Sequence, residues 1–368
     1  MGTLSLPQDS NLQEDCKDLR SAFKVLGCNE KKVIDILGRR TSAQRMEIAK
    51  AYQTVYGESL QKRLKSSFSG KLEKAMLLWM MDPAERDAVL LYECTKPGGT
   101  KGDHALLGIL CTRNSAQLYL IKQAYYTMFN ETLENHIDGC DTSIAADFQN
   151  KLLLAFARGN RPEGSNVDRH IALNDAHQLH KVCSGKMGNE DTIIRILSTR
   201  SCAQLTATFN YYHQHYGQDF EKALKKDKKD KAGEFEKALW VAVDCLRERA
   251  KYFAQELSTA LGEEGTDDDT LIRVIISRCE IDMQYIKLEF ANESKKSLDE
   301  AIGRNTSGNY RNFLLTLIGH CDLGLYSPRR FSNVTSSYYS PQSSTSQQPS
   351  NGSASFYSPR SSGHGSFN

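Results

Sequence analysis

The chain has 368 residues and a formal net charge of +2, from 47 Lys or Arg and 45 Asp or Glu. Residues 322–368 hold three arginines and one acid, so the rest of the chain is neutral, which argues against nucleic acid as a partner. No apolar run approaches the roughly 18 residues of a membrane span, and ten cysteines without a CxxC pair are typical of a reducing cytosol.

One pattern occurs four times along the chain. It reads ILGRRTSAQR at Ile36–Arg45, ILCTRNSAQL at Ile109–Leu118, ILSTRSCAQL at Ile196–Leu205 and, more faintly, IISRCEIDM at Ile275–Met283. Self-similarity at a near-constant period indicates a repeat architecture. Each copy has one arginine that we call its marker arginine, namely Arg40, Arg113, Arg200 and Arg278.

Helical periodicity dominates every copy. After Arg113, for example, Leu118, Ile121 and Tyr125 follow one another at steps of three and four residues. A second apolar stripe comes later in each copy, and no stretch alternates with period two. We therefore expect about five short helices per copy and no sheet. The marker arginines are expected to be structural, because a cation suits the negative end of a helix.

The copies and the segments around them predict the organisation of the chain. Residues 322–368 are rich in Ser, Pro, Gly and Tyr, a composition that is typical of disorder. The expected order is an N-terminal arm (1–11), repeat 1 (12–82), repeat 2 (83–156), a polar linker (157–170), repeat 3 (171–247), repeat 4 (248–321) and a disordered tail (322–368).

Four such units, each with a glycine loop before its second helix, resemble the annexin family. The plant branch is the most similar, through stretches such as MDPAERDAVLLYECTK and IIRILSTRSCAQLTATFNYY, and the resemblance covers about residues 12–320. It implies an all-α fold of four repeats arranged as a curved disc, with the loops on the convex, lipid-facing side. It also implies calcium as the cofactor, a cytoplasmic location and peripheral membrane attachment.

In that family, calcium is bound by carbonyls of a G-x-G-T-D loop and by an acid about 27 residues after the marker arginine. No copy here is intact. The first glycine is replaced by Val25 in copy 1 and by Glu263 in copy 4, and the second by Thr100 in copy 2 and by Met187 in copy 3. At the acid position copy 1 has Ser67 and copy 4 has Asn305, and in copy 2 Asp141 comes one residue late. Copies 2 and 4 are the best candidates. The ligands that the resemblance implies are Lys96, Gly98, Thr100, Asp141, Leu261, Glu263, Gly265 and Asn305.

Copy 3 carries a lysine-rich loop at the place that faces lipid in annexins. Clustered lysines near an anionic leaflet contribute about 1 kcal/mol each, although such runs also occur as plain solvated loops. The candidate lipid-binding residues are Lys225, Lys226, Lys228, Lys229 and Lys231.

Other constellations are weaker. His177, His180 and Cys183 recur every three residues and could bind zinc, but a structural role is favoured. No nucleophile–base pair can be identified, so we expect no enzyme, and a redox enzyme is a further alternative. The sequence thus predicts calcium-assisted, reversible binding to anionic phospholipid membranes, with weakened calcium sites. The alternative is a calcium-independent interaction scaffold that recruits cytoskeletal or signalling partners through its tail.

Overall fold

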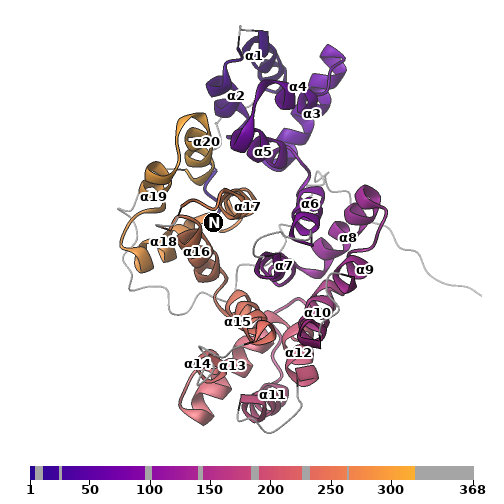
Figure 1. Cartoon of the computed structure of the whole chain (residues 1–368), viewed down its shortest axis with the longest axis vertical. Helices are drawn as coiled ribbons and strands as arrows, with labels where there is room; N and C mark the ends of the chain where they lie inside the picture. The colour runs from indigo at the N-terminus through magenta and orange to yellow at the C-terminus, as the bar shows by residue number, and fades with distance from the viewer. Residues whose placement is uncertain are drawn as a thin grey trace, which may run out of the picture. The chain divides into compact units, whose positions relative to one another are not determined.

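The computed structural model describes residues 1–4, 11–24, 27–95, 102–139, 144–183, 190–225, 233–262 and 265–319. Within these residues the chain forms twenty α-helices and no strand (Figure 1), which confirms the all-helical prediction. The predicted tail lies outside the described residues. So do nine predicted site residues, namely Lys96, Gly98, Thr100, Asp141, Glu263, Lys226, Lys228, Lys229 and Lys231.

The helices fall into four groups of five, as the repeated pattern predicts. Repeat 1 contains α1 (Leu12–Lys24), α2 (Glu30–Leu37), α3 (Ser42–Tyr56), α4 (Leu60–Ser67) and α5 (Gly70–Trp79). Repeat 2 contains α6 (Pro83–Thr95), α7 (Gly102–Leu110), α8 (Ser115–Phe129), α9 (Leu133–Asp138) and α10 (Ile144–Ala157). Repeat 3 contains α11 (Arg169–Cys183), α12 (Glu190–Thr199), α13 (Cys202–Tyr216), α14 (Phe220–Lys225) and α15 (Glu234–Arg247). Repeat 4 contains α16 (Arg249–Ala260), α17 (Asp268–Arg278), α18 (Met283–Ser294), α19 (Leu298–Asn305) and α20 (Gly308–Ile318).

The recurring letters after each marker arginine start the third helix of a repeat. In repeat 1, Thr41 caps α3 by accepting from the backbone N–H of Gln44, whose side chain accepts from the Thr41 N–H in return. Asn114 and Gln117 form the same capping box at α8. These caps satisfy backbone donors that a helix start leaves without partners. In the three clear copies, the polar residue after the marker arginine and the glutamine three residues later therefore mark the N-terminus of the third helix.

Three marker arginines are clamped to an acid from the first helix of their own repeat. Arg40 donates two hydrogen bonds to the Asp15 carboxylate, from Nε at 2.7 Å and from Nη2 at 2.6 Å. Arg113 Nε lies 2.6 Å from Asp87 Oδ2, and Arg200 pairs with the fully buried Asp175 in the same way. Charge-assisted pairs of this kind are strong and geometrically specific, and they confirm the structural role predicted for these arginines.

Repeat 4 stabilises its marker arginine differently. Phe253 occupies the position of Asp175, and the Arg278 guanidinium lies over its ring at 4.8 Å from the centroid. Arg278 forms its ion pair with the carboxylate of Asp282, which lies one turn later in the chain. A cation–π contact and a local ion pair thus replace the clamp between helices.

The repeats pack through their second and fifth helices. In one set of contacts α2 packs against α20 and α5 against α17, and in another α7 packs against α15 and α10 against α12 (Figure 1). Between repeats 1 and 4, Glu280 accepts from the Ser42 backbone N–H at 2.7 Å and from the buried Arg45 at 3.1 Å. These contacts hold the helices of neighbouring repeats together.

None of the helices in the described ranges is long and apolar enough to span a bilayer.

Candidate functional site

The loop of repeat 4 that leads into α17 lies against the turn between α19 and α20. Thr266 Oγ1 donates to the backbone carbonyl of Asn305 at 3.2 Å. Gly265, the preceding residue, has φ +126°, a conformation that residues with a Cβ rarely adopt. The structure therefore brings together two of the predicted calcium-site positions, Gly265 and Asn305, from segments 40 residues apart.

The oxygens that the described residues of this loop leave available are neutral. Within the described residues, no donor reaches the carbonyls of Leu261 and Gly265 or the Oδ1 of Asn305, whose Nδ2 donates to Ala301 at 2.9 Å. Asp267 is the N-cap of α17, and its carboxylate accepts hydrogen bonds from both the N–H and the hydroxyl of Thr270. Calcium binds carbonyl and amide oxygens, and its affinity rises with ligand charge. These residues fit a calcium ion, without the charge of a carboxylate.

In repeat 1 an arginine hydrogen-bonds to a backbone carbonyl at the start of the corresponding loop. Arg63 of α4 donates from Nη2 to the carbonyl of Phe23 at 2.7 Å, and Phe23 corresponds to Leu261 of repeat 4. The guanidinium thus donates to a carbonyl that calcium would need as a ligand. Ser67 stands at the acid position. Sequence comparison identified the missing glycine and acid, but it did not identify Arg63, which comes from a different helix.

One of the predicted lipid-binding lysines is paired inside repeat 3. Lys225 lies 3.1 Å from Glu221 Oε1 and 3.3 Å from Asp244 Oδ2. Burial raises the pKa of Asp244 to about 6, and the nearby Lys225 opposes this rise. Glu221 lies four residues before Lys225, so the first pair follows from helical spacing. The charge of Lys225 is largely compensated, and a contribution to lipid binding stays a prediction for its four neighbours.

The histidines of repeat 3 pack against tyrosines. His177 Nδ1 lies 2.5 Å from the Tyr216 hydroxyl, and the His180 ring stacks on Tyr216 at 3.6 Å between centroids. In the part of the chain that the structure describes, no group of three His, Cys, Asp or Glu residues could hold a metal ion. The contacts favour the structural role over the zinc alternative.

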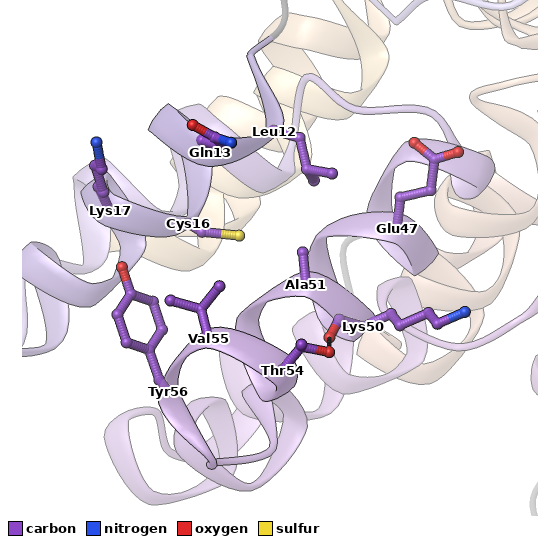
Figure 2. Close-up of a pocket in the computed structure, with 10 residues that line it drawn as sticks. All are labelled: Leu12, Gln13, Cys16, Lys17, Glu47, Lys50, Ala51, Thr54, Val55 and Tyr56. Carbon is purple, nitrogen blue, oxygen red and sulfur yellow. Dashed lines mark hydrogen bonds between the residues drawn. The ribbon is translucent and has the colours of Figure 1, made fainter.

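A mostly apolar groove of about 540 Å³ lies in repeat 1 between α1 and α3, and none of the predicted site residues lines it. Figure 2 shows Leu12 and Cys16 of α1 facing Ala51 and Val55 of α3. Burial and the charge of Asp15 raise the pKa of Cys16, which keeps it a thiol at neutral pH. A thiol is a poor nucleophile compared with a thiolate, so this groove offers hydrophobic contact rather than chemistry.

Two further cysteines are buried within the helices. Burial raises the pKa of Cys111 to about 12 and also raises that of Cys245. Reactive cysteines are partly exposed and have lowered pKa values. The two thiols thus have the properties of structural cysteines.

Comparison with known proteins gives a consistent result. The annexin family model matches residues 14–79, 86–155, 174–241 and 252–317. Annexin Gh1 of Gossypium hirsutum is 41% identical over 321 residues, which are 87% of this chain and 99% of the relative. The solved structure of annexin III has a TM-score of 0.81 and 37% identity, covering 87% of this chain and 98% of that one. Calcium-bound annexin (Sm)1 has a TM-score of 0.74 and 26% identity, covering 84% of this chain and 90% of that one.

Proposed function

Because the chain belongs to the annexin family, we propose that it binds anionic phospholipid membranes reversibly and peripherally, with the assistance of calcium. Calcium-dependent phospholipid binding is typical of annexins in general. The observation that carries the proposal here is the loop of repeat 4, where Gly265 and Asn305 are held together through Thr266. Bound calcium would supply a charge that links loop oxygens to lipid phosphate oxygens.

The proposed calcium sites are in repeats 2 and 4, and both are weakened. Repeat 4 offers neutral oxygens from Leu261, Gly265 and Asn305. Repeat 2 retains an acid, Asp141, one residue later than the family pattern, together with Lys96, Gly98 and Thr100 of its glycine loop. Weak oxygen sites have dissociation constants near 10⁻⁴–10⁻³ M, and we propose that this protein responds to calcium in that range.

The lysines that follow α14 add a second, calcium-independent attraction. Lys226, Lys228, Lys229 and Lys231 are close together in sequence, and each would contribute about 1 kcal/mol at an anionic surface. This attraction is screened by salt, because the Debye length is about 10 Å at 0.1 M. We therefore propose some binding without calcium at low ionic strength.

The second candidate function is a calcium-independent scaffold in the cytoplasm that recruits cytoskeletal or signalling proteins through residues 322–368. Repeat 1 favours it, since Arg63 there hydrogen-bonds to the Phe23 carbonyl, which corresponds to a predicted calcium ligand of repeat 4. A scaffold of this kind would not need calcium to bind its partner. In both candidates the chain is a binding protein rather than an enzyme.

Vesicle co-sedimentation separates the two functions. The full chain is mixed with phosphatidylserine vesicles in 0.1 M salt, with calcium or with EGTA, and calcium-dependent sedimentation is expected. Asp141→Ala should raise the calcium requirement, whereas Asp138→Ala should not, because it removes the same charge from the exposed end of α9. Equal sedimentation with calcium and EGTA would favour the scaffold.

A further inference from the structure

A hollow of about 290 Å³ lies between α10 and α12, where repeat 2 meets repeat 3. Its lining residues recur at steps of three and four along each helix, so each helix presents one continuous face to it. The residues that line it are Lys151, Leu154, Ala155 and Arg158 from the α10 side, and Asp191, Ile194, Arg195, Ser198 and Thr199 from α12.

The lining is positively charged, with three cations and one acid. Arg158 is exposed and makes no ion pair within the described residues. Arg195 is also exposed and donates from Nη2 to Gln178 Oε1 at 3.0 Å, which gives it a hydrogen bond but no opposite charge. The one acid, Asp191, offsets one of the three cations, so the lining keeps a net charge of +2.

The equivalent arginine of repeat 4 is neutralised. Arg273 lies five residues before its marker arginine, as Arg195 does, and its Nη2 is 2.7 Å from Glu256 Oε2. Glu256 corresponds to Gln178, since both lie 22 residues before the marker arginine of their repeat. Repeat 3 therefore keeps the cation and replaces its carboxylate partner with a neutral amide.

We propose that this hollow, named here the α10–α12 groove, binds a phosphate-bearing anion without calcium. Guanidinium groups match phosphate oxygens with paired, charge-assisted hydrogen bonds, and Arg158 and Arg195 provide two such groups, neither of which makes an ion pair within the described residues. Arg158 and Ser198 lie at the C-terminal ends of α10 and α12, whereas the predicted calcium loops precede the N-terminal ends. The anion can be a free phosphate or a phosphomonoester lipid headgroup.

The test uses the full chain in EGTA at 50 mM salt and two probes. Inorganic phosphate is titrated by calorimetry, and phosphatidylcholine vesicles with or without phosphatidic acid are tested by co-sedimentation. Arg158→Gln and Arg195→Gln should each weaken binding about fivefold or more, the effect of losing about 1 kcal/mol. Lys62→Gln, which removes an exposed charge from α4, is the control and should bind as the wild type.

Gln178→Glu is the sharpest variant, because it leaves both arginines in place and gives Arg195 the partner that Arg273 has. It should weaken binding about as much as Arg195→Gln, with no loss of melting temperature. Loss with phosphate alone identifies a free anion, and loss with phosphatidic acid alone identifies a lipid headgroup. The proposal is overturned if neither probe binds saturably, or if the groove variants bind as Lys62→Gln does. EGTA removes calcium-dependent binding, and the lysines that follow α14 are intact in the groove variants and in Lys62→Gln alike, so a difference between these variants reports on the groove.

Discussion

Replacing Asn305 with aspartate should strengthen calcium binding by repeat 4. Asn305 is exposed at the end of α19 and offers a neutral oxygen at the acid position. A carboxylate at ligand distance from a divalent ion gains about 3 kcal/mol, even at the dielectric constant of water. Dehydration of the carboxylate offsets part of this gain. We expect a net effect of about 1.4 kcal/mol, which is a tenfold lower calcium requirement.

The same substitution should destabilise the calcium-free protein. It removes the hydrogen bond from Asn305 Nδ2 to Ala301, which is 2.9 Å long, and it places a negative charge at the C-terminal end of a helix. Together these changes should lower the free energy of unfolding by about 1–2 kcal/mol. Added calcium should reverse this loss, because ligand binding stabilises the folded state.

Two measurements check this prediction. Calcium titration of binding to phosphatidylserine vesicles gives the requirement, and thermal melting in EGTA and in calcium gives the stability. Asn292→Asp makes the same chemical change near the end of α18 and serves as the control. If both variants need the same calcium concentration as the wild type, Asn305 is not at a calcium site and the assignment of repeat 4 is wrong.

Three further outcomes are expected, one from the structure and two from the sequence. Arg113 and Arg86 outweigh burial and lower the pKa of Asp87, so the stability from this carboxylate is present above its unfolded pKa and is lost as pH falls through the folded value. Asp87→Asn should cost about 3–5 kcal/mol at pH 7 and flatten the pH dependence of urea unfolding below about pH 4; an unchanged acid profile would contradict this. Deleting 323–368 should leave the melting temperature unchanged, and a clear drop would show that the tail packs on the helices. Binding to phosphatidylserine vesicles in EGTA should disappear between 20 mM and 300 mM salt, and binding that survives high salt would exclude the lysine loop as its cause.

Much of the fold follows from short-range patterns in the sequence. Apolar spacing predicts the helices, and the recurring polar residue and glutamine after Arg40 and Arg113 form capping boxes within four residues. The clamp of Arg200 by Asp175 also lies within one repeat, so its recurrence in the sequence indicates a structural pair. Such features depend on neighbours along the chain or on a constant register.

The candidate site depends on contacts between side chains that cannot be predicted by aligning the four repeats. Arg63 reaches the loop of repeat 1 from α4, and no other repeat has an arginine at that position to indicate its role. Phe253 replaces an acid, and only the structure shows that its ring accepts the Arg278 cation. Lys225 belongs to a lysine run by sequence, but the bundle places Asp244 beside it. Side chains from distant segments decide each of these cases.

The most direct test of weakened calcium sites is the calcium concentration at which half of the wild-type protein sediments with phosphatidylserine vesicles in 0.1 M salt. Neutral oxygens in repeat 4, a displaced acid in repeat 2 and Arg63 in repeat 1 predict a midpoint near 10⁻⁴–10⁻³ M. The midpoint should fall in Asn305→Asp and rise in Asp141→Ala. A micromolar midpoint that neither substitution changes would contradict the account.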